Sequence, residues 1–419
     1  MLQGTSVKSF MTTNMTTKET INKAVKYSQG RINGRPTQVD WILAMMTGIL
    51  LVFGIMMVFS TTFDLSYHWH GSRFVMLVNH LWHLSVGVMA LVLCALLDYR
   101  KLRLPIVAVF MLLVTIVALI LVLFVGIDRG LVAGSYQPSE LAKLVMVIYL
   151  AVWMSSKQDQ LNDFWYGMAP FAVVVGFIAG LIILQPDISA AATILVIAVL
   201  MFFLAGAAIV QLGGALLIAS LVGYLVISFN STGQQRIAEY VAGLRDITEG
   251  SWHVRQAIVA FVDGGMFGVG LGKSAGKFSY LPVPHTDSIF AVVGEELGLI
   301  GSLIVVVLFV VLCWRGILIS VRVQDPFGKL LAGGLTGWIA LEVIVNIGVI
   351  LGVLPFAGNA LPLVSYGGSS LVVTLTGIGI LMSVSRYDLE VRPDRESGAI
   401  IDLRWWNRRA RLPSNGSRR

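Results

Sequence analysis

Apolar runs recur along the chain from residue 41 to residue 385, separated for the most part by short polar segments. A helix rises about 1.5 Å per residue, so each run is long enough to cross the ~30 Å of hydrocarbon in a bilayer. The expected spans are 41–63, 79–98, 104–126, 137–155, 165–184, 188–206, 209–229, 287–314, 329–354 and 363–385. This pattern predicts an all-α, polytopic membrane protein with about ten transmembrane helices.

Three polar segments flank or interrupt these runs. Residues 1–39 are rich in Thr, Asn, Lys and Gln, and residues 389–419 are rich in Arg. We expect both segments to be cytoplasmic tails, the first of them disordered, around a membrane domain of residues 40–388. Residues 230–286 are charged and are the only long interruption between the runs, which predicts one long extracellular loop.

The positions of Lys and Arg predict the orientation, because cytoplasmic loops carry an excess of positive charge. If the N-terminus is cytoplasmic, seven of these residues fall in short inner loops and two in short outer loops. The inner ones are Arg100, Lys101, Arg103, Lys157, Arg315, Arg322 and Lys329, and the outer ones are Arg73 and Arg129. We therefore expect both termini in the cytoplasm, with an even number of spans, and residues 230–286 outside.

Composition supports the membrane assignment and excludes other classes. The 419 residues are 56% hydrophobic and 13% charged, whereas a soluble domain has about 45–50% apolar and about 25% charged residues. The net charge of +7 arises mainly in the tails and short loops, so it does not indicate a nucleic-acid-binding face. Cys94 and Cys313 lie in apolar runs, far apart, and form neither a disulfide framework nor a metal-ligand pattern.

Several ionisable residues fall inside the expected spans, where burial is costly unless they find a partner or serve a function. Glu140 and Lys143 are three residues apart on one helix, which predicts a buried ion pair. Asp287 begins the eighth span beside the long outer segment, where a carboxylate can accept a proton from a substrate. Glu296 faces away from Asp287 on a helix, so the two form no acid/base pair. Glu342, in the ninth span, is more typical of interhelical hydrogen bonding than of chemistry.

Two glycine-rich segments indicate unusual backbone. In DGGMFGVGLGKSAGK at 263–277, Phe267 stands where a phosphate-binding loop needs a glycine. The glycines instead favour turns at the membrane surface, with Lys273 and Lys277 available to an anionic headgroup. In LPLVSYGGSS at 361–370, small and polar residues open a span. That composition fits close helix packing or, alternatively, irregular backbone that lines a cavity.

Four histidines lie near the expected outer surface, at His68, His70, His80 and His83. Their positions permit a metal site, but Asp64 is the only acidic residue near them in the sequence. Ordinary interfacial histidines explain the group better, and we predict no metal site there.

Three longer strings together resemble the SEDS family (shape, elongation, division and sporulation) of bacterial membrane proteins, which includes FtsW, RodA and SpoVE. They are QPSELAKL at 137–144, GGMFGVGLGKSAGKFSYLPVPHTDSIFAVVGEELGLIG at 264–301 and NIGVILGVLPFAGNALPLVSYGGSS at 346–370. Their order and spacing match the family, and the resemblance covers residues 40–388. Lys277 and the YLP string at 280–282 are more similar to the FtsW branch than to RodA.

The resemblance implies a ten-span bundle in the bacterial inner membrane with both termini cytoplasmic. It implies a peptidoglycan glycosyltransferase that polymerises lipid II beside a class B penicillin-binding protein and other division or elongation proteins. The family's catalytic Asp falls on Asp287, which would be the base for the 4-hydroxyl of the acceptor sugar. The need for a divalent cation stays open.

Substrate contacts follow from the same resemblance. Cations stabilise the charge of the leaving undecaprenyl pyrophosphate, and the candidates in the outer segment are Lys273, Lys277, Arg255 and Arg236. The QPSE..K element implies that Glu140 and Lys143 lie near a central cavity. The HTD and SYGGSS strings add His285, Ser365 and Ser369 as candidates for substrate binding.

The chain departs from the family's pattern in QPDISA at 185–190, at Val283 after LP and at Ser288 after HTD, which is consistent with a specialised member. Two other functions remain open at this point. One is a flippase or transporter of a lipid-linked precursor, with Glu140, Lys143 and Glu342 along its route. The other is a non-catalytic scaffold that activates a penicillin-binding protein.

Overall fold

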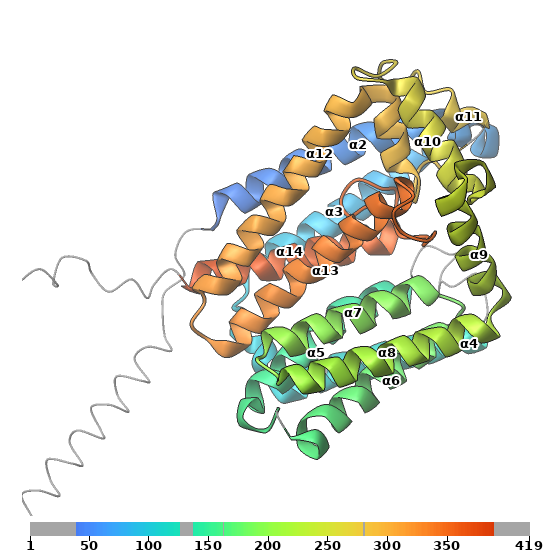
Figure 1. The fold of residues 1–419 in the computed structure, drawn as a ribbon. Helices are drawn as coiled ribbons and strands as arrows, with labels where there is room; N and C mark the ends of the chain where they lie inside the picture. The colour runs from blue at the N-terminus through green and yellow to red at the C-terminus, as the bar shows by residue number, and fades with distance from the viewer. Residues whose placement is uncertain (1–38, 126–136, 162, 280, 389–419) are drawn as a thin grey trace, which may run out of the picture. The chain divides into compact units, whose positions relative to one another are not determined.

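The computed structural model describes residues 39–125, 137–161, 163–279 and 281–388. These residues form helices, turns and irregular segments, with no strand among them. Val39–Arg386 is one compact unit, which Figure 1 shows as a bundle of helices. The predicted tails lie outside the described residues, apart from Val39 at the end of the first, and so does Arg129.

The helices match the predicted apolar runs. Within the described ranges, nine helices are long and apolar enough to cross a membrane, and α7 is a shorter apolar helix. The main helices are α2 (Trp41–His70), α3 (Val75–Leu96), α4 (Pro105–Val125), α5 (Pro138–Ser156), α6 (Ala169–Ile183), α7 (Ile188–Leu204), α8 (Ile209–Phe229), α9 (Ser231–Arg245), α10 (Trp252–Gly264), α11 (Gly276–Ser279), α12 (Ile289–Arg322), α13 (Pro326–Ile350) and α14 (Gly368–Asp388). Short turns of 3-10 or π helix lie at Tyr99–Arg103, Gln158–Gln160, Phe164–Met168 and Ile247–Glu249.

Three boundaries differ from the prediction for identifiable reasons. α12 continues past residue 314 to Arg322, because apolar residues recur beyond Arg315, so Arg315 and Arg322 lie on this helix instead of in the predicted inner loop. α2 continues past residue 63 to His70 and ends where Gly71 adopts a φ of 68°, the left-handed conformation that favours glycine. α14 begins at Gly368 instead of residue 363, because residues 361–367 are turn and irregular backbone. The first seven residues of LPLVSYGGSS are therefore irregular, and the last two of these seven, Tyr366 and Gly367, line a cavity.

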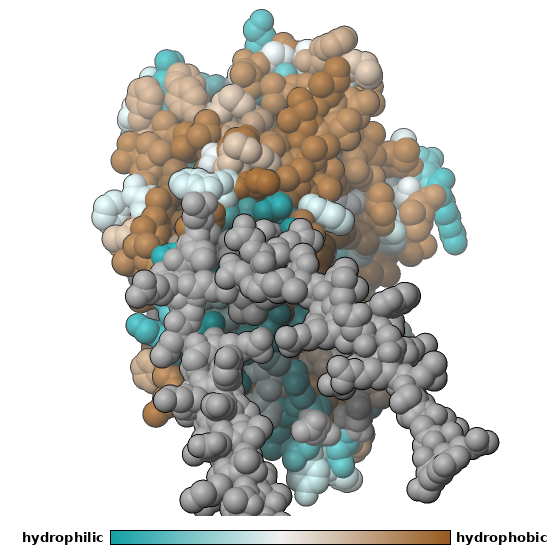
Figure 2. Space-filling model, turned by 90° about the vertical axis from the view of Figure 1, so that its left-hand side faces the viewer, coloured by the Kyte–Doolittle hydropathy of each residue, from teal (hydrophilic) through white to brown (hydrophobic). Residues whose placement is uncertain are grey.

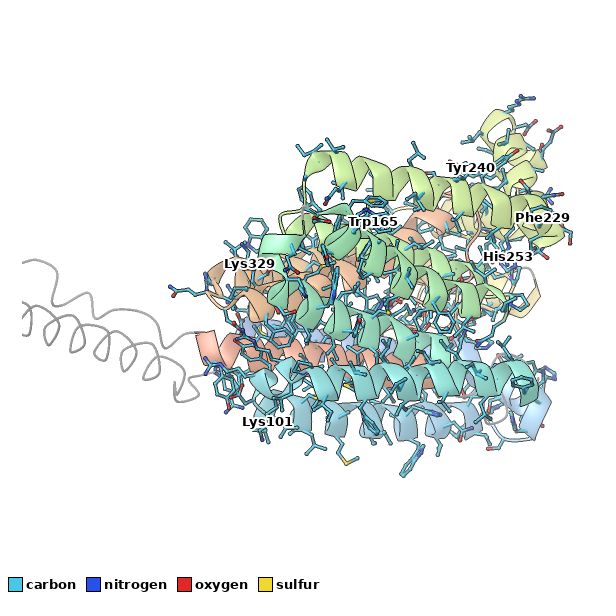
Figure 3. The ribbon with its side chains drawn as sticks, turned by 90° about the horizontal axis from the view of Figure 1, so that it is seen from below. Lys101, Trp165, Phe229, Tyr240, His253 and Lys329 are labelled. Atoms are coloured by element: carbon cyan, nitrogen blue, oxygen red, sulfur yellow. The ribbon has the colours of Figure 1, made fainter. Side chains whose placement is uncertain are left out.

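The segment predicted as one long loop, 230–286, is largely helical. It contains α9, α10 and the single turn α11, so it presents ordered helices instead of an extended loop. Figure 3 shows Tyr240 and His253 of this segment toward one end of the helix bundle, and Lys101 and Lys329 toward the other. That separation is the one expected for an outer segment and two inner loops.

The core of the unit is formed by α14, α5 and α13. In their most apolar windows 72%, 67% and 61% of residues are buried, against 6% in α8. Figure 1 shows α13 and α14 between α2 and α12 on one side and α4–α8 on the other. A Cβ at Gly379 of α14 would lie 2.4 Å from the carbonyl oxygen of Leu91, so glycine allows α14 to pack closely on α3.

The outward faces of the helices are apolar. Figure 2 shows a broad hydrophobic surface over much of one face of the unit. The exposed side chains include Phe110, Phe124, Val173 and Leu217. Helices with apolar outer faces and ionisable groups turned inward are typical of proteins that contact lipid.

Candidate active site

A cavity of about 430 Å³ lies between α5, α7, α13 and the irregular segments before α12 and α14. Of the predicted site residues, it is lined by Glu140, Lys143, His285, Asp287 and Ser369. Glu140 and Ser369 are more than two hundred positions apart in the sequence. The packing of the central helices brings the five residues together. Its volume is in the range of about 300–1,000 Å³ that is usual for ligand sites.

Asp287 lies two residues before α12, on a segment held by its neighbours. Nδ2 of Asn346 on α13 donates to the carbonyl oxygen of Asp287 at 3.0 Å and to that of Asn359 at 2.6 Å. A Cβ at position 358 would lie 3.0 Å from Oδ2 of Asp287, so Gly358 leaves room beside the carboxylate. The backbone of Asp287 is fixed while its side chain faces a cavity.

The electrostatic setting of Asp287 suits a base. Burial raises the pKa of Asp287 above its ordinary value, and a hydrogen bond with Thr286 and the positive charge of Arg236 oppose that rise. A carboxylate with a raised pKa holds a proton more strongly, which favours proton transfer from a hydroxyl group.

The segment before α14 holds the HTD string in place. The backbone N–H of Tyr366 donates to the carbonyl oxygen of His285 at 2.8 Å, and Oγ of Ser365 donates to that of Thr286 at 2.7 Å. Ser365 is buried and is not among the residues that line the cavity. The structure therefore places this predicted substrate contact behind the site, where it supports the HTD backbone.

His285 lines the cavity with an imidazole ring that has few polar contacts. Burial lowers the pKa of His285 to about 4, so its imidazole is uncharged at neutral pH. Nδ1 is buried and has no hydrogen-bond partner in the described part of the chain. The ring contacts Tyr366 at a centroid distance of 5.7 Å, and His80 stacks on Tyr366 at 5.8 Å.

Glu140 and Lys143 form the predicted buried ion pair, with Nζ of Lys143 2.8 Å from Oε1 of Glu140. Glu342 of α13 adds a third member, because Nζ of Lys143 also donates to its Oε1. The expected interhelical contact of Glu342 is thus confirmed. We call Glu140, Lys143 and Glu342 the charged triad, and all three line the cavity.

Asp187 was not predicted as a site residue, yet it also lines the cavity. Its carboxylate accepts from Nε2 of Gln137 at 2.7 Å and from Oγ of Ser139 at 2.8 Å, which joins α7 to the start of α5. Oγ of Ser189, one of the departures in QPDISA, donates to it at 3.1 Å. This last bond lies within the start of α7, where it holds the carboxylate that α5 binds.

The glycine-rich segment packs on α12 instead of on a ligand. Gly298 interrupts α12 with a φ of 70° and a ψ of −169°. The freed backbone groups pair with the segment, for example Val269 N–H with Glu295 O at 3.0 Å and Leu299 N–H with Gly265 O at 2.9 Å. A side chain at position 268 would collide with this backbone, so the glycines serve close approach.

Two buried glutamates hold the same segment. Glu295 accepts from Oγ of Ser274 at 2.5 Å and from the N–H of Ala275 at 2.7 Å. Glu296 forms an ion pair with Lys277 at 2.9 Å, and the side chain of Lys277 is 3% exposed. Lys277 is therefore bound within the protein instead of facing a headgroup.

The other predicted cations lie outside the cavity lining. Arg255 donates to the carbonyl oxygen of Thr248 at 2.8 Å, and Lys273 is exposed. The guanidinium of Arg236, on α9, lies 5.2 Å from the ring centre of Phe356. Arg236 is the one whose charge lowers the pKa of Asp287, so it is the predicted cation most closely related to the site.

Asn346 and Asp187 were missed by reasoning from the sequence. For Asn346 a signal exists: Trp338, Glu342 and Asn346 follow at intervals of four residues and share one face of α13. Within the described ranges, no group of three or more His, Cys, Asp or Glu is placed to share a metal ion.

Comparison with known proteins identifies the family. The family model for the FtsW/RodA/SpoVE group, described as a cell cycle protein, matches residues 40–390. The chain belongs to the FtsW/RodA/SpoVE family. The resemblance seen in the three sequence strings is thus confirmed, and the chain is an integral, multi-pass membrane protein.

The alignments with relatives in this family extend over nearly the whole length of each relative. The chain is 35% identical over 355 residues to the probable peptidoglycan glycosyltransferase FtsW of Geobacter metallireducens, covering 83% of this chain and 94% of the relative. It is 37% identical over 366 residues to the stage V sporulation protein E of Bacillus subtilis, covering 84% and 98%.

Solved structures share the fold. One chain comes from a peptidoglycan synthase complex studied for the coordination of polymerization and crosslinking. It matches with a TM-score of 0.65 and 25% identity, covering 85% of this chain and 99% of that chain. The rod shape determining protein RodA of Thermus thermophilus matches with a TM-score of 0.60 and 24% identity, covering 84% and 97%.

Proposed function

We propose that the protein is a peptidoglycan glycosyltransferase that polymerises lipid II into glycan strands. The observation that carries this proposal is Asp287: its side chain lines a polar cavity, its backbone is fixed by Asn346, and burial raises its pKa. Family membership supports the same chemistry, because the relative from Geobacter metallireducens carries the name of that activity.

In the proposed reaction Asp287 is the general base. It takes the proton from the 4-hydroxyl of the acceptor sugar while that oxygen forms a bond to the anomeric carbon of the donor sugar. The bond from that carbon to the donor's pyrophosphate breaks, and undecaprenyl pyrophosphate leaves with the electron pair. Arg236 and Lys273 are the cations proposed to contact the pyrophosphate, because Lys277 and Arg255 have protein partners.

The proposed partner is a class B penicillin-binding protein, which would crosslink the strands, beside other division or elongation proteins. A solved relative belongs to a peptidoglycan synthase complex, which supports a partner of this kind. The proposed location is the bacterial inner membrane with both termini cytoplasmic. The bias of Lys and Arg in the short loops supports that orientation.

One experiment separates this function from the two alternatives. The purified chain and its penicillin-binding partner are placed in liposomes that contain lipid II, and glycan polymer and leaflet exchange are both measured. We expect polymer even when the partner is a variant that lacks crosslinking activity. Leaflet exchange without polymer would favour the flippase, and polymer made only by another enzyme would favour the scaffold.

The orientation has its own test. In a chain without its native cysteines, Glu249→Cys and Lys157→Cys each add one thiol at an exposed position. A membrane-impermeant maleimide applied to intact spheroplasts should label only Glu249→Cys, and Lys157→Cys should react after permeabilisation. Labelling of both from the same side contradicts the proposed topology.

A further inference from the structure

The charged triad carries more negative than positive charge. Lys143 lies between Glu140 and Glu342, so one ammonium is paired with two carboxylates and the formal sum is −1. The side chain of Glu342 is 3% exposed, and that of Lys143 is 5% exposed. An uncompensated charge at such a depth is costly, and it requires a further hydrogen-bond donor.

Two carboxylate oxygens of the triad lack that donor. Oε2 of Glu140 and Oε2 of Glu342 are buried and have no hydrogen-bond partner among the described residues. Both glutamates line the cavity, so a molecule bound there can reach them. Nε1 of Trp338, one turn before Glu342 on α13, interacts with the Glu342 carboxylate. Its geometry still leaves both Nε1 of Trp338 and Oε2 of Glu342 without a regular hydrogen bond in the described ranges.

The net charge of the cavity lining restricts which chemical groups can bind in the cavity. Its described lining contains four carboxylates, from Glu140, Asp187, Asp287 and Glu342, and one amine, from Lys143. A pyrophosphate placed among these groups would be repelled, and its own charge would be poorly solvated. Uncharged donors such as hydroxyl and amide N–H groups are favoured there, because hydrogen bonds to charged acceptors are the strong ones.

We propose that the charged triad is the saccharide subsite of the cavity, where Glu342 and Glu140 accept hydrogen bonds from hydroxyl or N-acetyl N–H groups of the sugar. This assignment rests on the proposed function. The pyrophosphate then lies outside the cavity, toward Arg236 of α9, and Asp287 stands between the two subsites. Lys143 orients the carboxylates and does not bind phosphate.

Equilibrium binding tests the assignment with two probes. In an Asp287→Asn background, which prevents turnover, lipid II carries the sugars and undecaprenyl pyrophosphate lacks them. Glu342→Gln keeps the side-chain shape and removes the charge. We expect its affinity for lipid II to fall about 10- to 100-fold, the range for a hydrogen bond to a charged group. Its affinity for undecaprenyl pyrophosphate should stay the same or increase.

Equal losses for both probes, or no loss for either, overturn the subsite. Trp338→Phe is the control for a protein donor: it should change lipid II binding by less than threefold, and a loss equal to that of Glu342→Gln would show that the indole satisfies Oε2. If Glu342→Gln does not fold, Glu140→Gln replaces it, because its Oε2 is also without a partner in the described chain.

The outcome also separates this inference from the function on which it rests. If lipid II does not bind the Asp287→Asn protein, the glycosyltransferase proposal falls and the subsite with it. If lipid II binds and neither glutamate variant weakens it, only the subsite falls.

Discussion

Asn346 donates from Nδ2 to the carbonyl oxygen of Asp287 at 3.0 Å, across 59 positions of sequence. The same nitrogen donates to Asn359, which lines the cavity. One side chain on α13 therefore fixes two segments around the carboxylate. Because Glu342 lies one turn away on the same face of α13, this helix sets the geometry of both Asp287 and the charged triad.

Replacing Asn346 should reduce the rate more than substrate binding. Asn346→Leu keeps a similar volume and removes both hydrogen bonds, so the Asp287 backbone is free to shift. A displacement of about 1 Å at a reacting group can cost about 10²-fold in rate. We expect kcat for lipid II polymerisation to fall by about that factor, with a much smaller change in KM. A KM increase at unchanged kcat would assign Asn346 to substrate binding.

The pH dependence should report the pKa of Asp287. A general base is active when deprotonated, so kcat/KM falls as pH falls through its pKa. Because burial raises the pKa of Asp287 above 3.8, its ordinary value, the midpoint of this fall in kcat/KM should lie above pH 3.8. We call this fall the acid limb of the profile. The positive charge of Arg236 lowers the pKa, so Arg236→Gln should move the limb to higher pH.

Arg255→Gln is the matched control, because Arg255 bonds to Thr248 and is not among the groups that shift the pKa of Asp287. Its acid limb should coincide with that of the native protein. A limb that stays in place in Arg236→Gln would show that another group controls the profile.

Lys143 should be essential for stability. Lys143→Met leaves two buried carboxylates without their cation, a change that typically costs about 3–5 kcal/mol. We expect a large drop in the thermal unfolding temperature in detergent and in the level of protein in the membrane. Lys157→Met removes an exposed cation and should change the unfolding free energy by less than about 0.5 kcal/mol. Equal stability of the two variants would contradict the role of the triad.

The sequence predicted the helices well, because membrane spans depend on local apolar length. It also predicted the Glu140–Lys143 pair, because both residues lie on one helix three positions apart. The partnership with Glu342 depends on how α5 and α13 pack, and no local pattern encodes it. The same holds for Lys277: its position suggested a headgroup contact, whereas packing of the glycine-rich segment on α12 places it against Glu296.

Val283, where the chain departs from the family's LPE string, has a φ of 45°. A β-branched residue in the left-handed region costs about 1–3 kcal/mol. Val283→Gly removes that strain at an entropic cost of about 0.5–1 kcal/mol, so the unfolding free energy should rise by about 1 kcal/mol. Val262→Gly, at an exposed position of α10, should lower it by about 0.5–1 kcal/mol. The same sign for both variants in thermal unfolding would contradict the strain.

The most direct test of the account is lipid II polymerisation by the Asp287→Asn protein together with the proposed penicillin-binding partner. Loss of a general base typically costs about 10² to 10⁴ in rate, so the variant should be nearly inactive while it remains folded and bound to the partner. Asp263→Asn, at an exposed carboxylate on α10, should polymerise at the native rate. Polymerisation by Asp287→Asn at close to the native rate would contradict the assignment of Asp287 as the base.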